Sequence, residues 1–364
     1  MGEASSAPRD AARGRPSGDA ATVFAALDLG TNNCRLLIAT PTARGFRIID
    51  AFSRIVRLGE GLNQSGRLGA GAMERALGAL TICADRIARR GASRVRAVAT
   101  QACRAAANGQ QFIDEVAART GLRLAIISPK EEARLSVIGC LDLLDREAEA
   151  ALVLDVGGGS TELSWVDLTA PGLDAGPRRV AHWRLPIKAW LSVPIGVVTL
   201  AERFPEAAAG GIGWYRAMVE AMKAEVSRFH RADALRETFA NGHAHLVGTS
   251  GAITSLAGLH LDLPRYDRGR VDGLWMTRAQ CDAVTDRLTA MTPAERAAQP
   301  CIGPDRADLV LAGAAILQAV QELWPCERVR VADRGLREGL LLSLMSTRRR
   351  GRLRGSRGPR RIAA

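Results

Sequence analysis

The stretch LDVGGGSTEL, residues 154–163, places three glycines and two hydroxyl side chains between an aspartate and a glutamate. It continues the apolar run ALVLDV and leads into LSWVDL, in which apolar and polar residues alternate. An apolar run, a glycine turn and an alternating run are typical of a β-hairpin. Because glycines let backbone N–H groups converge on an anion, and hydroxyls add donors, the turn is expected to bind phosphate.

Two familiar phosphate loops are excluded by the residues themselves. A Walker loop has lysine directly before its final serine or threonine, and the only lysines here are Lys130, Lys188 and Lys223. The dinucleotide fingerprint requires glycine where Glu162 stands, followed by a helix rather than an alternating strand.

A second stretch, LDLGTNN at 27–33, repeats the plan between the apolar runs VFAALDL and CRLLIAT. Two copies with matched flanks indicate an internal duplication. Helical patterns at 72–90 and 110–120 alternate with strands, which favours an α/β fold. Paired Asp-x-Gly hairpins are typical of the duplicated actin-like (ribonuclease H-like) ATPase fold, which has two domains with a cleft between them. An aspartate at each strand end, Asp28 and Asp155, can hold Mg²⁺ there.

The length also favours two domains, because single cores rarely grow beyond ~250 residues. We expect an N-terminal tail at 1–22, domain I at 23–150 and domain II at 151–345, with the last helix a candidate to pack back on domain I. Residues 346–364 form an arginine-rich tail that we expect to be disordered.

The formal net charge of +12 is concentrated at one end of the chain. Eight arginines with no acid among them leave +4 for residues 1–347: Arg348, Arg349, Arg350, Arg352, Arg354, Arg357, Arg360 and Arg361. The tail is either a solubilising terminus or a contact for a polyanion.

No apolar run reaches the ~18 residues of a membrane span, and no signal peptide is recognisable. The seven cysteines form no CxxC pair, and an odd number does not suit a disulfide framework. We therefore expect a cytoplasmic protein without membrane contact, in which most cysteines are buried thiols.

Two further helix starts bear on the site. Ser128 suits an N-cap, Pro129 the first helical position and Glu131 the third position of a capping box, which leaves Glu132 without a structural role. The segment Thr249-Ser250-Gly251 precedes the apolar helix ITSLAGL and is a third candidate anion loop.

Within this fold the chain resembles the exopolyphosphatase and guanosine pentaphosphate phosphohydrolase family over residues 24–345. The resemblance rests on motifs that occur in the family's order: LDLGTNNCRLLIA, VRLGEGL (56–62), ATQACRAA (99–106), ISPKEEAR (127–134), LDVGGGSTEL, VPIGVVTLAERF (193–204), VGTSGAITSLA (247–257) and VADRGLREGLL (331–341).

The resemblance implies a Mg²⁺-dependent hydrolase that splits the terminal phosphoanhydride of inorganic polyphosphate, of guanosine pentaphosphate, or of both, and that forms a homodimer. It assigns catalysis to Glu132 and Glu162, one of which would activate a water molecule, and leaves open which one is the base. It implies phosphate contacts from Arg104 and, more weakly, Arg57. The expected phosphate-binding residues are Gly30, Thr31, Asn32, Asn33, Arg104, Gly157, Gly158, Gly159, Ser160, Thr161, Thr249, Ser250 and Gly251.

Three positions depart from the family's pattern. Gln101 stands where the family often has a small residue, Pro129 where it usually has glycine and Thr199 where it often has arginine. The competing functions are a guanosine pentaphosphate 5′-phosphohydrolase on the same site, an ATP-dependent kinase of the same superfold, and a catalytically silent polyphosphate or nucleotide sensor. Glutamate in the EEAR segment argues against the kinase, and both glutamates with the triple glycine argue against the sensor.

Overall fold

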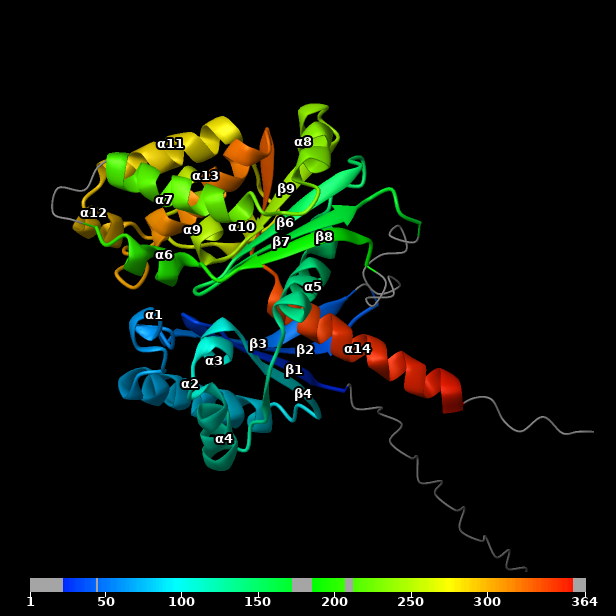
Figure 1. Ribbon diagram of the computed structural model, residues 1–364. Helices are drawn as coiled ribbons and strands as arrows, with labels where there is room; N and C mark the ends of the chain where they lie inside the picture. Colours follow the sequence, from blue (N-terminus) through cyan, green and yellow to red (C-terminus); the bar gives the residue numbers. More distant parts are fainter. Residues whose placement is uncertain (1–21, 44, 172–184, 207–211, 356–364) are drawn as a thin grey trace, which may run out of the picture.

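The computed structural model describes residues 22–43, 45–171, 185–206 and 212–355, with side chains described up to Ser346. Its strands form two mixed sheets (Figure 1). The first sheet has the order β3 (Phe46–Ile55), β2 (Asn33–Pro41), β1 (Phe24–Leu29), β4 (Arg94–Ala99) and β5 (Leu124–Ile126). The second has the order β10 (Trp275–Thr277), β11 (Arg328–Ala332), β9 (Ala244–Thr249), β6 (Ala150–Val156), β7 (Thr161–Asp167) and β8 (Ile187–Val193).

The two sheets share one topology, apart from the extra strand β10. In the first, β1 pairs antiparallel with β2 and parallel with β4. In the second, β6 pairs antiparallel with β7 and parallel with β9. Both predicted hairpins and the predicted duplication are therefore confirmed.

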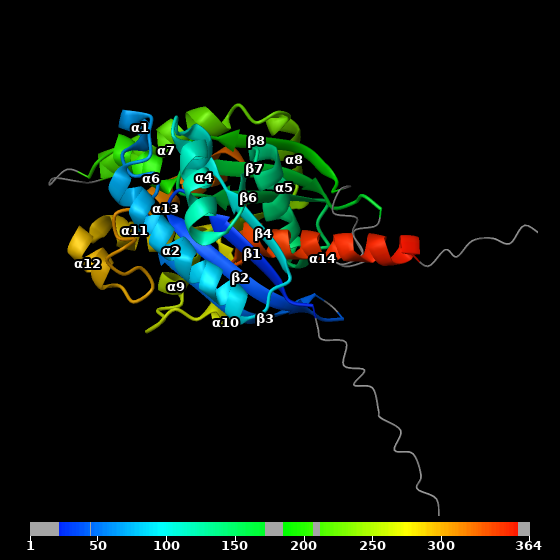
Figure 2. The same ribbon diagram turned by 90° about the horizontal axis from the view of Figure 1, so that it is seen from below.

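Helices cover the outer faces of both sheets and fill the space between them (Figures 1 and 2). The first sheet packs outward against α2 (Ala70–Arg89) and α4 (Gly109–Thr120), and the second against α7 (Ile212–Val226), α9 (Gly251–His260), α11 (Arg278–Ala290) and α13 (Val310–Leu323). Between the sheets lie α5 (Pro129–Cys140) and α14 (Leu336–Gly355). Shorter helices are α1 (Leu62–Ser65), α3 (Gln101–Ala105), α6 (Val197–Arg203), α8 (Ala232–Ala240), α10 (Arg268–Val271), α12 (Pro293–Ala298) and the 3₁₀ helix Leu141–Leu143.

Two expectations from composition can be compared with these elements. The seven cysteines are all buried free thiols, as predicted. Within the described part of the chain, no helix combines the length and the apolar character needed to cross a membrane.

Strand alternation directs the hairpin acids into the space between the sheets. Successive side chains of a strand point to opposite faces. In β1, Leu27 and Leu29 belong to the outer core, whereas Phe24 and Ala26 belong to the core between the sheets, so Asp28 points inward. By the same alternation Asp155 follows Ala151 and Val153 of β6 and also points inward.

The start of α5 agrees in part with the sequence. The Ser128 side chain caps the helix by accepting a hydrogen bond from the Glu131 backbone N–H at 3.2 Å, as predicted. The second half of the predicted capping box, in which the Glu131 side chain would accept a hydrogen bond from the Ser128 backbone N–H, is wrong. The Glu131 carboxylate pairs instead with Arg96 at 2.9 Å and Arg134 at 2.7 Å. Two nearby guanidiniums are stronger partners for a carboxylate than one backbone N–H.

The C-terminal boundary of the ordered chain differs from the prediction. Helix α14 continues to Gly355, into the segment assigned to a disordered tail from residue 346 onward. Arginine is among the good helix formers, and the first proline after α14 begins is Pro359, so the sequence offers no early stop. The predicted tails at residues 1–21 and 356–364 lie outside the described residues.

Helices α5 and α14 contact each other backbone to backbone. A Cβ atom at Gly339 would lie 2.0 Å from the Leu135 carbonyl oxygen, and one at Gly139 would lie 2.0 Å from the Gly335 carbonyl oxygen. Neither position can hold a larger residue without moving a helix. This contact fixes the two helices on which the space between the sheets is built.

We expect Gly339→Ala to lower the free energy of unfolding by about 1–3 kcal/mol, because the added methyl group overpacks the α5–α14 contact. The matched control is Gly78→Ala in α2, where nothing lies within 4 Å of an added Cβ. There the better helix propensity of alanine is expected to stabilise the protein by about 0.5–1 kcal/mol. Urea unfolding of both variants measures the two changes in the free energy of unfolding. Equal changes in Gly339→Ala and Gly78→Ala would contradict the close contact between α5 and α14.

Candidate active site

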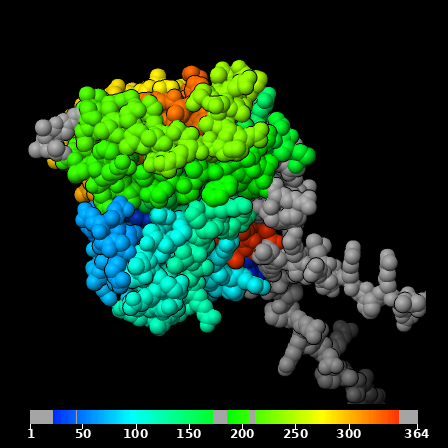
Figure 3. All heavy atoms as spheres, viewed as in Figure 1, coloured from blue at the N-terminus to red at the C-terminus, as the bar shows by residue number. Residues whose placement is uncertain are grey.

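The two glycine loops meet in a cleft between the halves of the molecule, which Figure 3 shows as two stacked masses. A Cβ atom at Gly158 would lie 3.1 Å from the Cβ of Thr31, and one at Gly159 would lie 2.5 Å from the Thr31 hydroxyl oxygen. Only glycine permits this approach of one loop to the other. The loops thus form the two sides of one cradle of backbone N–H groups.

The third candidate loop lines the same cleft at the start of α9. The Ser250 side-chain oxygen accepts hydrogen bonds from the backbone N–H groups of Ala252 and Ile253, both at 3.2 Å. The Thr249 hydroxyl donates to the Arg334 carbonyl at 2.5 Å. These two hydroxyls therefore shape the loop.

Six carboxylates line the cleft, and Asp333 and Glu338 belong to the segment between β11 and α14. The other four come from the two hairpins and α5: Asp28 of β1, Glu132 of α5, Asp155 of β6 and Glu162 of β7. Asp155 and Glu162 are direct partners in the β6–β7 ladder, where like charges are unfavourable. The two glutamates are buried, with 8% and 2% of their surfaces exposed. A cluster of buried acids in a cleft is a candidate functional site.

Burial is the main cause of the raised pKa values of these acids, because a low dielectric disfavours the charged form. It raises the pKa of Glu132 to about 7 and that of Asp28 to about 6, in both cases against the opposing effect of nearby arginines. Burial also raises the pKa of Asp155. The pKa of Glu162 lies well above its usual range because of burial and, next, because of the charges of Glu132 and Asp155.

Side chains outside the cleft lining orient three of these acids. Ser136 of α5 donates a short hydrogen bond to Asp155, and Ser192 of β8 donates to Glu162 at 2.8 Å. Arg104 donates to Glu132 at 3.1 Å. The sequence patterns did not reveal either serine, although Ser136 lies four residues after Glu132 and hence on the same helix face.

Four guanidiniums line the cleft. Arg334 is paired with Asp272, and the other three are Arg35, Arg306 and Arg337. Arg35 and Arg306 lie 3.6 and 3.9 Å from where a Cβ at Gly251 would be, beside the third loop. Within the described chain, none of the three side chains forms a hydrogen bond or ion pair. The sequence patterns did not reveal them either, but the duplication marks Arg35, which follows Asp28 by the same interval as Glu162 follows Asp155.

Most of the predicted phosphate-binding residues lie together in the cleft lining: Gly30, Thr31, Asn32, Asn33, Gly157, Gly158, Gly159, Ser160, Thr249, Ser250 and Gly251. Thr161 does not, because its hydroxyl donates to the Ile195 carbonyl at 2.7 Å. Arg104 is outside the lining, and Arg57 forms an ion pair with Asp308 at 3.0 Å. Thr199 caps α6, accepting from the Gly196 N–H at 2.7 Å.

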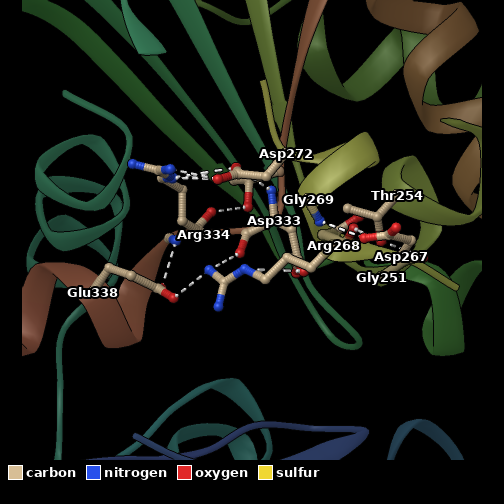
Figure 4. A network of polar contacts seen from close by, with 12 residues as sticks. Gly251, Thr254, Asp267, Arg268, Gly269, Asp272, Asp333, Arg334 and Glu338 are labelled. Carbon is tan, nitrogen blue, oxygen red and sulfur yellow. Dashed lines mark hydrogen bonds and ion pairs between the residues drawn. The ribbon is translucent and has the colours of Figure 1, made fainter. Parts of the chain in front are cut away.

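The polar floor of the cleft continues into the segment between β11 and α14 (Figure 4). Arg334 pairs with Asp272, and Arg268 reaches Asp333 at 3.4 Å and Glu338 at 3.2 Å. Glu338, buried at the start of α14, also accepts the Gly335 N–H at 2.9 Å. This network fixes the short segment that carries Arg337 into the cleft.

Two of the cleft acids, Asp28 and Asp155, have the chemistry of a magnesium site. Asp28 Oδ1 is buried without a hydrogen-bond partner, and Asp155 lies on the adjacent inward face of β6. The described residues contain no group of three His, Cys, Asp or Glu side chains able to hold a metal by themselves. Two carboxylates without a third ligand fit Mg²⁺, which keeps several waters and takes further ligands from substrate phosphates.

Comparisons with known proteins agree with this geometry. Residues 37–348 match the Ppx/GppA phosphatase family. Exopolyphosphatase 2 of Mycobacterium tuberculosis is 31% identical over 341 residues, which cover 89% of this chain and 99% of that protein.

Two solved structures share the fold. The crystal structure of an exopolyphosphatase-like protein superposes with a TM-score of 0.77 at 29% identity, covering 90% of this chain and 99% of the other. That of the Aquifex aeolicus member of the Ppx/GppA family superposes with a TM-score of 0.70 at 27% identity, covering 93% and 99%. The predicted actin-like fold of two domains is thereby confirmed. The chain belongs to the Ppx/GppA phosphatase family and is a hydrolase that acts on phosphoanhydride bonds.

Proposed function

We propose that this protein is an exopolyphosphatase, which removes the terminal phosphate of inorganic polyphosphate. The observation that carries the proposal is the approach of Gly158 and Gly159 to Thr31, which joins two N–H cradles beside buried Glu132 and Glu162. A terminal phosphoryl group needs such positioned donors and an in-line water more than it needs covalent chemistry. The name of the Mycobacterium tuberculosis relative supports the same substrate class.

Positive charge for the rest of the polymer comes from the three cleft arginines that form no ion pair with a described residue. Backbone N–H groups of the loops at 30–33, 157–160 and 249–251 grip the terminal phosphates. Arg35, Arg306 and Arg337 then face the oxygens of the next phosphates, for which a guanidinium fork is well suited.

Glu132 is the group we assign as the general base. A base that works near neutral pH needs a pKa near neutrality, and burial raises the pKa of Glu132 to about 7. The pKa of Glu162 is held well above its usual range by burial and by the neighbouring acids, so Glu162 is the partner that keeps its proton longer. Glu132 orients a water and accepts its proton, and Glu162 positions that water.

Asp155 and Asp28 are the residues that would hold Mg²⁺. The ion, when bound, neutralises charge that develops on the transferred phosphoryl group. Ser136 keeps the Asp155 carboxylate fixed through its hydrogen bond.

Guanosine pentaphosphate is the competing substrate, because its terminal phosphoanhydride presents the same groups to the loops as the end of a polyphosphate chain. The homodimer, the cytoplasmic location and the contact of the arginine tail with a polyanion stay predictions from the sequence.

Phosphate release should be measured on long and short polyphosphate, guanosine pentaphosphate and ATP. We expect the fastest release from polyphosphate, and a loss of about 10²–10⁴-fold in kcat for Glu132→Gln, because an amide cannot accept the proton. Glu162→Gln should also be strongly impaired. The matched control is Glu131→Gln, which changes the adjacent carboxylate paired with Arg96 and Arg134 and should stay active. Undiminished activity in Glu132→Gln would refute the assignment of Glu132 as the general base.

The pH dependence follows from the raised pKa of Glu132. A general base must be ionised, so kcat should rise with pH through about pH 7 and reach a plateau above it. At about pH 6 we expect a rate roughly tenfold below the plateau, since about one site in ten carries the ionised base. A profile that is flat from about pH 5 upward, as for an ordinary glutamate, would contradict the assignment.

The metal proposal predicts a specific defect in Asp155→Asn. Loss of one negative oxygen should raise the Mg²⁺ concentration required for half-maximal activity by about tenfold or more. Magnesium binding should also be weaker by isothermal titration calorimetry, which needs no turnover. Asp167→Asn at the far end of β7 is the control, since Asp167 pairs with Lys188 outside the cleft. Equal magnesium requirements in both variants would exclude Asp155 as a ligand.

A further inference from the structure

We propose that Gln101 and Arg104 are positioning residues for Glu132. Gln101 holds the Arg104 guanidinium, and Arg104 holds the Glu132 carboxylate in the cleft. The inference rests on the proposed function, in which Glu132 is the base. Both side chains lie outside the lining of the cleft, so their effect on a substrate is exerted through Glu132.

The guanidinium of Arg104 has three acceptors. One terminal nitrogen donates to the Ile127 carbonyl at 2.7 Å and to Glu132 Oε2 at 3.1 Å. The other donates to Gln101 Oε1 at 2.6 Å. The Arg104 side chain is 19% exposed. A fork bound on both nitrogens in a fixed plane aligns its carboxylate partner and is not free to grip a phosphate.

These contacts tie Glu132 to its helix start as well. Ile127 immediately precedes Ser128, the N-cap of α5, so Arg104 holds both the chain entering the helix and the carboxylate in its first turn. Rotation of the Glu132 side chain away from the cleft would break the ion pair. The arrangement therefore limits Glu132 to one orientation.

Gln101 connects this ion pair to the central glycine loop. It is the first residue of α3, and Arg104 follows three residues later on the same helix face. A Cβ at Gly159 would lie 3.1 Å from Gln101 Cγ, so the Gln101 stem packs against the loop while its amide oxygen holds Arg104.

The charges around Glu132 show why it needs a fixed cation. Asp28 of β1 and Asp155 of β6 act to raise its pKa, and the Glu162 and Glu132 carboxylates repel each other. Among the described residues, Arg104 is the one that forms an ion pair with Glu132. Since removing one partner of a buried pair leaves an uncompensated charge, a loosened Arg104 would leave Glu132 without its counter-charge.

A double-mutant cycle tests the proposal. Gln101→Met keeps a side chain of similar length against Gly159 and removes the amide oxygen, and Arg104→Met removes the cation. We expect kcat on short polyphosphate to fall about tenfold in Gln101→Met and about hundredfold in Arg104→Met, because misplaced catalytic groups cost rates of this order. The double variant should be no slower than Arg104→Met, because Gln101 acts through Arg104. KM should stay within about twofold throughout.

The control is Gln110→Met in α4, an exposed glutamine hydrogen-bonded to Asp114, which should retain full activity. An increase of KM in Arg104→Met with unchanged kcat would make Arg104 a phosphate contact and overturn the proposal. Effects of the single variants that multiply in the double variant would also overturn it. If the wild-type protein released no phosphate from any substrate, the proposed function would fail. Urea unfolding of the wild-type protein, the two single variants and the double variant would then decide: additive effects on stability overturn the coupling, and non-additive effects support it.

Discussion

The site depends on four carboxylates held between two sheets, of which Glu132 and Glu162 are buried and Asp28 and Asp155 are half-buried. Taking charged groups out of water is costly, and each acid lies near others of the same sign. The described chain compensates with specific partners: Arg104 on Glu132, Ser136 on Asp155 and Ser192 on Glu162. The burial that makes these acids costly for folding also raises the pKa of each of them, that of Glu132 to about 7.

The cleft is shaped by the two helices that lie between the sheets. Helix α5 follows β5 of the first sheet and packs on strands of the second, whereas α14 follows β11 of the second sheet and packs on β1 and β2 of the first. Their contact at Gly139 and Gly339 leaves no room for side chains. Glu132 and Arg337 therefore enter the cleft from two helices whose separation is set by backbone contact. Because this contact is rigid, the positions of the two side chains relative to each other are fixed at the backbone.

Local patterns in the sequence were sufficient to predict the hairpins, the duplication, the N-cap at Ser128 and the residues of the glycine loops. Each of these is encoded by a short stretch with a definite backbone requirement. The partners of the buried acids were not predictable in this way, since Ser192 and Arg306 reach the cleft only through tertiary packing. Arg104 illustrates the limit, because a guanidinium near phosphate loops has two plausible partners. Its distances to Glu132 and Gln101 show which contacts it makes.

The two halves of the duplication differ at the ladder position opposite the loop aspartate, and this difference affects the chemistry of the cleft. Asp28 faces Arg35 across the first hairpin, while Asp155 faces Glu162 across the second. An aspartate opposite an arginine is a favourable cross-strand pair, whereas an aspartate opposite a glutamate is not. The first hairpin thus contributes a cation that suits a polyanionic substrate, and the second contributes an acid whose pKa is raised. Two hairpins with the same residue opposite the aspartate would supply either the cation or the acid with a raised pKa, but not both. In the proposed reaction, substrate binding and catalysis therefore both depend on the difference between the two repeats.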